Sequence, residues 1–194
     1  MSLKKTLKET PSQTAGPYVH IGTLPAVAGI DVPSHDTSCN TGLEGGAPII
    51  IKGVIRDGGG ELVKDAMVEI WQAGADGQYG PGRKGWARSH TDFETGEFRF
   101  ETVKPGKLAG ALGVGEQAPH VTLMIFARGI NLHLHTRIYF SDEDAANAAD
   151  PLLNAIEDDA ARNTLIARPD PESNNTWAFN VVLRGEGETV FLDI

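Results

Sequence analysis

The sequence predicts a mainly β protein: a β-sandwich of mostly antiparallel strands with a short helical insertion and a long irregular N-terminal arm. Three observations predict this class. From residue 49 onward, short runs rich in β-branched and aromatic residues are separated by glycine-rich turns. One segment, beginning near residue 141, carries helix-start signals instead. Residues 1–48 contain recurrent proline and glycine without a sustained period, so we divide the chain into an arm, 1–48, and a sandwich domain, 49–194.

The arm contains more apolar side chains than a solvated tail would. Between its prolines and glycines lie several large apolar residues: Tyr18, Val19, Ile21, Leu24, Val27 and Ile30. A loop of this length without structure of its own is unusual in a compact domain. We therefore expect the arm to be held against protein, partly against a partner subunit.

Two strands are expected to open the domain. The run "PIIIKGVIRD" predicts the first strand, and "DGGGE" predicts the turn that follows it. The run "DAMVEIWQA" predicts the second strand, with Met67, Glu69 and Trp71 on one face and Val68 and Ile70 on the other.

Three pairs of strands are expected farther along the chain. "DFETGEFRF" predicts a hairpin that turns at Thr95 and Gly96 and points Phe98 and Phe100 inward. "HVTLMIFAR" and "LHLHTRIYF" predict two strands joined by the tight turn "RGIN". Near the end, "TWAFNVVLRG" and "TVFLDI" are expected to pair around "EGE".

Two short helices are expected between these strands. Ser141 is a favourable N-cap, and acidic residues fill positions 142–144, where the helix dipole favours negative charge. A second short helix is expected from about Asp158 to Ala167.

Composition excludes several classes of function. The 194 residues carry a net charge of −9, with 17 basic against 26 acidic side chains, which is opposite to the charge of a typical nucleic-acid binder. No apolar run approaches the ~18 residues of a membrane span, and the N-terminus has no apolar stretch typical of a signal peptide. The single cysteine, Cys39, cannot form an internal disulfide. We expect a cytoplasmic protein without nucleic-acid or membrane partners.

Histidines are the most metal-like feature of the chain. His133 and His135 lie two residues apart in a predicted strand and therefore share a face. Such a pair can hold zinc or iron where further ligands converge, and otherwise packs or lies at an interface. His120 follows Pro119 at the start of its strand, where it is either a third ligand or an isolated, satisfied histidine.

A tyrosine and an arginine complete the set of candidate site residues. Tyr79 follows the strand of Trp71, and its phenolate could bind Fe(III), although a loop tyrosine can equally be a packing residue. Arg137 shares the face of His135 and can pair with a carboxylate or recognise an anion. The chain shows neither a nucleophile elbow nor a phosphate loop, since "RDGGGE" lacks the lysine.

Several segments together resemble the intradiol ring-cleavage dioxygenases. "IIIKGVIRDGGGELVKDAMVEIWQAGADGQYG", "HTDFETGEFRFETVKPG" and "APHVTLMIFARG" occur in the order of that family. "TPSQTAGPYVHIG", "ARGINLHLHTRIYF" and "GEGETVFLDI" are similar to the alpha subunit of a two-subunit member, whose homologous beta subunit holds the iron. The resemblance covers almost the whole chain.

The resemblance implies a vestigial metal site in this chain. The family binds Fe(III) with two tyrosines and two histidines, and here Tyr79 falls at the first tyrosine and His120 at the first histidine. Thr122 falls at the second histidine, and "KPGKLAGALG" offers no second tyrosine. An arginine of the family falls near Gln117, so its charge is expected to be lost. We expect no metal in this chain and Fe(III) in the partner beta subunit.

The same resemblance implies an active site at the interface of the two subunits. Residues of this chain that match the pocket are Thr14, Gly16, Pro17, Tyr18 and Arg137. The implied reaction cleaves 3,4-dihydroxybenzoate with O2 to 3-carboxy-cis,cis-muconate, a step of aromatic catabolism. Two alternatives stay open: a self-sufficient iron dioxygenase of the same fold, and a non-catalytic transthyretin-like binding module.

Overall fold

The structure is a computed structural model that describes residues 21–31, 39–81, 84–110 and 115–193. Its strands are β1 (Pro48–Arg56), β2 (Met67–Gln72), β3 (Trp86–His90), β4 (Glu97–Val103), β5 (His120–Phe126), β6 (Leu134–Phe140), β7 (Ile166–Pro169), β8 (Thr176–Ala178) and β9 (Val181–Val182). Its helices are the 3-10 helix η1 (Pro25–Ala28) and the α-helices α2 (Asp144–Ala149), α3 (Pro151–Ala155) and α4 (Asp159–Asn163). None of the described helices has the length and hydrophobicity that a membrane crossing requires.

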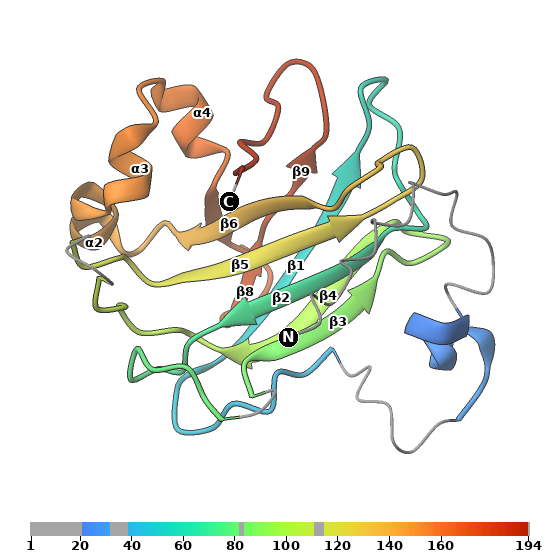
Figure 1. The fold of residues 1–194 in the computed structure, drawn as a ribbon, viewed down its shortest axis with the longest axis horizontal. Coiled ribbons are helices and arrows are strands. Elements are labelled where there is room, and N and C mark those ends of the chain that lie inside the picture. The colour runs from blue at the N-terminus through green and yellow to red at the C-terminus, as the bar shows by residue number, and fades with distance from the viewer. Residues whose placement is uncertain (1–20, 32–38, 82–83, 111–114, 194) are drawn as a thin grey trace, which may run out of the picture.

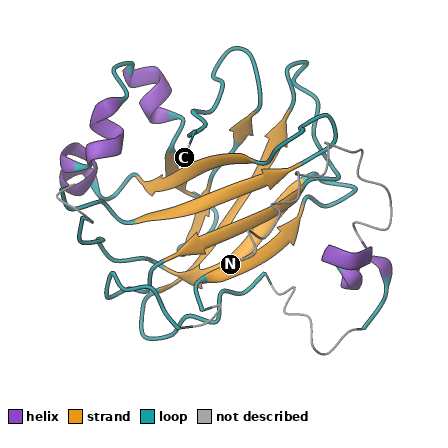
Figure 2. Cartoon of the chain, viewed as in Figure 1, coloured by secondary structure: helices purple, strands orange, loops and turns teal. Residues whose placement is uncertain are grey.

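The strands form two layers that β7 joins. The order along the sheet is β3-β2-β5-β6-β7-β8-β1-β4, with β9 beside β1. β3, β2, β5 and β6 form one antiparallel layer, and β4 pairs with β1 in the other. Parallel pairing occurs where β7 meets β6 and where β8 and β9 meet β1. The predicted mainly β sandwich is therefore confirmed, and the three α-helices gather at one end of the strands (Figures 1 and 2).

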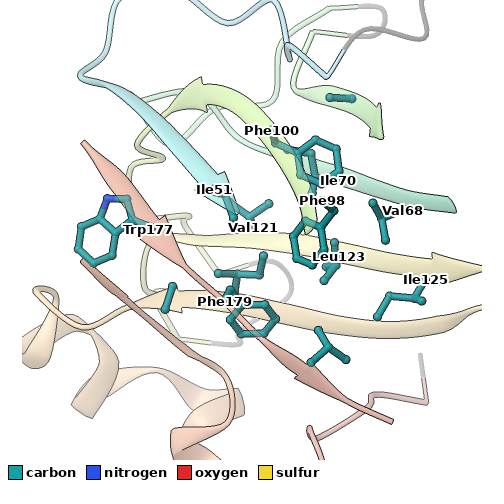
Figure 3. Packing of buried hydrophobic residues seen from close by; sticks show 14 of the residues in the cluster. Ile51, Val68, Ile70, Phe98, Phe100, Val121, Leu123, Ile125, Trp177 and Phe179 are labelled. Carbon is teal, nitrogen blue, oxygen red and sulfur yellow. The ribbon is translucent and has the colours of Figure 1, made fainter. Parts of the chain in front are cut away.

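The core lies between the two layers. Alternate residues of β2 and β5 point inward and are fully buried, among them Ile70 and Leu123. Phe98 and Phe100 of β4 meet them from the opposite layer, as predicted (Figure 3). Complete burial of such a side chain contributes about 1.5–3 kcal/mol relative to leaving it exposed. This shared interior holds the two layers together.

Alternation places a second set of residues on the outer face of the first layer. Register pairs align Trp86 of β3 with Trp71 of β2, Trp71 with Thr122 of β5, and Thr122 with Arg137 of β6. Side chains that are directly opposite on neighbouring strands lie about 4.5–5.5 Å apart at Cβ. The outer face therefore carries a continuous row that ends at Arg137.

The described parts of the arm pack on the domain of the same chain. Leu24 is buried, and the backbone carbonyl of Thr23 accepts a hydrogen bond from Arg88. Thr41 is also buried, and its hydroxyl bonds the hydroxyl of Thr102 at 2.8 Å. Contact of the arm with a partner subunit stays a prediction.

The hairpin predicted at residues 92–100 turns where expected, but the segment before the turn is not a strand. Gly96 makes the turn with a positive φ of 74°, and the backbone N–H of Asp92 donates to Glu97. The side chain of Asp92, however, accepts bonds from the backbone N–H groups of Glu94 and Thr95, which curls the chain before it can extend. Because β3 pairs with β2 and β4 pairs with β1, this turn crosses between layers.

The predicted C-terminal strand pair is also wrong. Thr189 exchanges two hydrogen bonds with Val182, one through its backbone N–H and one through its hydroxyl. The hydroxyl replaces a backbone acceptor, so the pairing does not continue as a ladder. The tail instead turns to β6, where the backbone N–H of Leu192 donates to the carbonyl of His135 at 2.7 Å.

The helices start and end at other residues than predicted. Ser141 is not an N-cap, because α2 begins at Asp144 and Glu143 holds the cap position without a side-chain bond. α4 begins at Asp159, next to its N-cap Asp158 and close to the expected start, but it ends at Asn163. Ile166 and Ala167 belong to β7, since pairing with β6 and burial of Ala167 outweigh local helix preference. The sequence also failed to predict α3.

Candidate functional site

The candidate site lies on the outer face of β5 and β6, at the end of these strands nearest the helices (Figure 1). β5 contributes His120 and Thr122, which are two residues apart and share a face. β6 contributes Arg137 and Tyr139, which pair with Thr122 and His120 respectively. The predicted positions in these two strands are thus brought together. Thr14, Gly16, Pro17 and Tyr18 lie outside the described residues.

Arg137 dominates the electrostatics of the site. One terminal nitrogen, Nη1, donates to Oε1 of Gln117 at 2.8 Å and to the hydroxyl of Tyr139 at 3.3 Å. Its Nε is buried and has no hydrogen-bond partner among the described residues. No described carboxylate forms an ion pair with it. Arg137 is therefore a half-buried cation whose hydrogen-bond partners among the described residues are neutral groups.

Gln117 lies beside a positive charge although it carries none itself. The resemblance places an arginine of the family near Gln117, and the glutamine itself is neutral. A guanidinium nevertheless reaches it, because Arg137 extends from the neighbouring strand. The charge is supplied from β6 instead of from the segment that precedes β5.

Tyr139 connects Arg137 to a buried carboxylate. Its hydroxyl donates to Oδ1 of Asp150 at 3.2 Å, and Asp150 is fully buried. Asp150 is the N-cap of α3, where Oδ1 also accepts from the backbone N–H groups of Leu152 and Leu153. Burial raises the pKa of Tyr139 well above its usual range, an effect that Arg137 partly offsets. The phenol is therefore a neutral hydrogen-bonding group.

His120 is held in one tautomer. It is only 3% exposed, and its Nδ1 lies 2.7 Å from the carbonyl oxygen of Ala118. Because a carbonyl only accepts, Nδ1 carries the proton and Nε2 is the acceptor. Burial, and then the charge of Arg137, lower the pKa of His120 to about 4. The imidazole is neutral near pH 7, which is the form that a metal ligand takes.

Tyr79 lies at the edge of the same site. It follows β2 in the loop and stacks on Trp71, with ring centroids 5.6 Å apart and planes 7° apart. Tyr79 is 47% exposed. Burial of the hydroxyl raises its pKa, and the charge of Arg137 acts in the opposite direction. Tyr79 is therefore a protonated phenol at neutral pH, packed as part of an aromatic wall.

These donors do not fit a tightly bound ferric ion. The matching positions offer one imidazole, one protonated phenol and the weakly coordinating hydroxyl of Thr122, beside a fixed positive charge on Arg137. Fe(III) requires a fuller set of anionic oxygen and imidazole donors. In the described part of the chain, no three side chains of the His, Cys, Asp or Glu type converge on a point that could hold a metal ion.

The two histidines of "NLHLHT" lie at the start of β6, away from the end that carries the candidate site, and do not join these donors. His133 precedes the strand, is exposed, and packs against Phe126 with ring centroids 5.5 Å apart. His135 is half-buried opposite Met124, and its buried Nδ1 has no partner among the described residues. Burial lowers the pKa of His135, with smaller contributions from Arg137 and His133. A packing or interface role for this pair stays a prediction.

Sequence reasoning missed Asp150 as a site residue. The carboxylate also accepts the backbone N–H of Ala118 at 2.9 Å, so it links α3 to the segment that carries Gln117. The available signal was the pair Asp150-Pro151, because an N-cap acid followed by proline at the first helical position is typical of a helix start.

Comparison with known proteins relates this fold and site to one family. A family described as Dioxygenase matches residues 26–185. The protocatechuate 3,4-dioxygenase alpha chain of Pseudomonas putida is 46% identical, over 96% of this chain and 97% of its own length. The protocatechuate 3,4-dioxygenase beta chain of Burkholderia cepacia is 31% identical, over 80% of this chain and 73% of its own length.

A solved structure supports the fold. The dioxygenase domain of a dioxygenase and carbohydrate-binding protein fusion from Streptomyces sp. SirexAA-E has a TM-score of 0.61 and 19% identity. The match covers 93% of this chain and 100% of that chain. The extent of the family match and the identity to two of its members place the chain: it belongs to the intradiol dioxygenase family.

Proposed function

We propose that this chain is the alpha-type subunit of a protocatechuate 3,4-dioxygenase, and that it completes an active site at the interface with an iron-bearing beta-type subunit. The observation that carries the proposal is the combination of an incomplete ligand set with a half-buried Arg137 that forms no ion pair with a carboxylate among the described residues. Extensive identity to an alpha chain supports it, and the detectable identity to a beta chain fits two subunits that share one fold.

The proposed reaction inserts both atoms of O2 into 3,4-dihydroxybenzoate between the carbons that bear the hydroxyl groups. Ring opening gives 3-carboxy-cis,cis-muconate. Fe(III) in the partner subunit would supply the Lewis acid that binds the catecholate oxygens and makes the ring reactive toward O2. The residues of this chain bind and enclose the substrate and keep water out of the pocket.

Arg137 has the chemistry to hold the substrate carboxylate. Its guanidinium is positive at any physiological pH, and it offers planar donors that match a carboxylate. In a chain of net charge −9, a cation with no carboxylate partner in the described part of the chain provides the local attraction that an anionic substrate needs. We expect Arg137 to act on substrate capture more than on the chemical step.

The arm would close the other side of the pocket. Gly16 and Pro17 would let the backbone approach a flat ring while fixing its course, and Tyr18 would add an amphipathic wall. Thr14 would contribute a hydroxyl. These roles rest on the matching positions in the family.

Coexpression with a beta-type subunit tests the proposed function. We expect the chain purified alone to contain little iron and to leave 3,4-dihydroxybenzoate intact. The co-purified complex should contain iron and cleave the ring. Cleavage is measured as loss of substrate absorbance and as O2 uptake. A chain that alone binds near-stoichiometric iron and cleaves the substrate would overturn the proposal in favour of a self-sufficient dioxygenase. Binding without any cleavage in the complex would favour a binding module.

Substitution of Arg137 tests its role within that complex. Arg137→Gln removes the charge and should lower kcat/KM by about 5- to 150-fold, mainly through KM, as expected for loss of a charge-assisted bond worth about 1–3 kcal/mol. Arg168→Gln is the control, because Arg168 is an exposed strand arginine. The neutral analogue 3,4-dihydroxybenzamide should bind the wild type and Arg137→Gln equally. An unchanged kcat/KM would remove Arg137 from the site.

A further inference from the structure

We propose that Tyr139 and Asp150 position the guanidinium of Arg137, so that the helical insertion controls substrate capture at the interface site. This inference rests on the proposed function, since it assumes that Arg137 meets the substrate. It assigns a functional role to α3, whose Leu153 also packs in a buried cluster with Tyr139. Tyr139 and Asp150 are positioning residues, because they would act through Arg137 and not on the substrate.

The hydrogen bonds run in one direction, from Arg137 to Tyr139 and from Tyr139 to Asp150. The carboxylate of Asp150 can only accept, so the hydroxyl proton of Tyr139 points to Asp150. The lone pairs of the Tyr139 oxygen are then free to face Nη1 of Arg137, which can only donate. A phenol fixed on one side by a carboxylate therefore presents an acceptor, and not a donor, to the guanidinium.

Asp150 is itself held rigidly. Its Oδ1 accepts from the backbone of Leu152 and Leu153 at 2.9 and 3.0 Å, and its Oδ2 accepts from the backbone of Ala118 at 2.9 Å. It is fully buried and makes no ion pair with a described lysine or arginine. A buried carboxylate needs compensation, and backbone donors with the Tyr139 hydroxyl provide it. Asp150 is thus a fixed point and not a mobile side chain.

Both described hydrogen-bond acceptors of Arg137, Gln117 and Tyr139, are linked to Asp150. Tyr139 is bonded directly to Asp150. Gln117, the other acceptor, immediately precedes Ala118, whose backbone N–H the same carboxylate holds. One carboxylate at the start of α3 therefore sets the positions of the two groups that orient the guanidinium. Loss of that orientation would weaken binding of the substrate carboxylate without altering the iron-bearing subunit.

A double-mutant cycle in the co-purified complex tests the inference. Tyr139→Phe keeps the ring and removes the hydroxyl, and it should raise KM for 3,4-dihydroxybenzoate about 3- to 10-fold with kcat changed less than about twofold. In an Arg137→Gln background, the same substitution should leave KM unchanged, because it acts through the guanidinium. A purely structural role for Tyr139 would give the same factor in both backgrounds.

Thr136→Val is the matched control. Thr136 lies on the same strand, its side-chain hydroxyl is also buried and hydrogen-bonded, to the carbonyl of Val190 at 2.8 Å, but it faces the interior. This variant should lower the unfolding temperature and leave KM unchanged. Where Tyr139→Phe fails to give a soluble complex, Asp150→Asn tests the same link, since it retains the shape and removes the charge. It should raise KM in the same way.

The outcomes separate the two proposals. If Arg137→Gln raises KM but both Tyr139→Phe and Asp150→Asn leave it unchanged, the positioning inference is overturned and the proposed function stands. If Tyr139→Phe raises KM equally in the presence and absence of Arg137, the inference is also overturned. If Arg137→Gln itself leaves KM unchanged, the proposed substrate role of Arg137 fails and the inference fails with it.

Discussion

The inner and outer faces of the layer that contains β5 and β6 use neighbouring residues for opposite purposes. On the inner face, Leu123 and Ile138 are fully buried and contact the second layer. On the outer face, Thr122 and Arg137 are half-exposed and lie in a row with two tryptophans. Thr122 directly precedes Leu123 in β5, and Arg137 directly precedes Ile138 in β6. The comparison indicates that the inner face packs the two layers together, while the outer face carries the polar groups of the candidate site.

The two faces also differ in how their polar side chains are hydrogen-bonded. Thr136 faces inward, and its hydroxyl reaches a single backbone carbonyl. Arg137, the next residue, faces outward and joins a network of Gln117, Tyr139 and Asp150 while one of its nitrogens stays without a described partner. The inward polar group is bonded within the fold, whereas the outward group belongs to a polar network on the face that carries the candidate site.

The largest expected effect belongs to the inner face. Phe98→Ala removes a fully buried ring from between the layers and should lower the free energy of unfolding by about 3–5 kcal/mol. Denaturant titration of the full chain measures this change. Arg137→Gln serves as the outer-face comparison and should cost less than half as much. Equal losses for the two variants would mean that the outer face also stabilises the fold.

Much of the inner face could be predicted from the sequence, because strand alternation is a local property. Val68 and Ile70, and Phe98 and Phe100, are buried as the two-residue period predicts. The errors occur where distant parts of the chain decide the outcome. The turn after Asp92 leads to the other layer, and Ile166 joins a strand instead of a helix because β6 is available to pair with it.

The outer site was predicted only in part for the same reason. The shared face of His120 and Thr122 follows from their spacing, and resemblance and chemistry indicate Tyr79 and Arg137 as candidates. Asp150 could not be connected to them, since its hydrogen bonds reach Ala118, 32 positions away, and Tyr139, 11 positions away, in other elements of the fold. Short-range patterns reveal which residues share a strand face, but not which helix cap lies behind that face.

A second test concerns the pH dependence of stability at the outer face. The pKa of His120 falls from 6.5 to about 4 on folding, so the unfolded chain binds a proton first as the pH is lowered. The contribution of neutral His120 to the free energy of unfolding is fully present above pH 6.5. It is lost as the pH falls toward 4, by about 3 kcal/mol in total. The measurement is denaturant unfolding at several pH values between 7 and 4.

The control for this test is His120→Gln, which cannot titrate in that range. Carboxylates such as Asp92 and Asp170 also change protonation at low pH, so the informative quantity is the difference between the wild type and the variant. That difference should shrink steadily below pH 6.5. A constant difference would show that His120 is not shielded from protons and that this part of the outer face is open to water.

The smallest expected effect is at the far end of the outer face, where His133 precedes β6. Its ring packs on Phe126 but is exposed, so His133→Gln should change the free energy of unfolding by no more than about 0.5 kcal/mol. KM of the complex should also be unchanged, because His133 lies outside the network around Arg137. A rise in KM comparable with that of Arg137→Gln would extend the site along the whole length of β6. The outer face would then be one continuous functional surface, and its division into a site near the helices and an ordinary surface near the turn would be wrong.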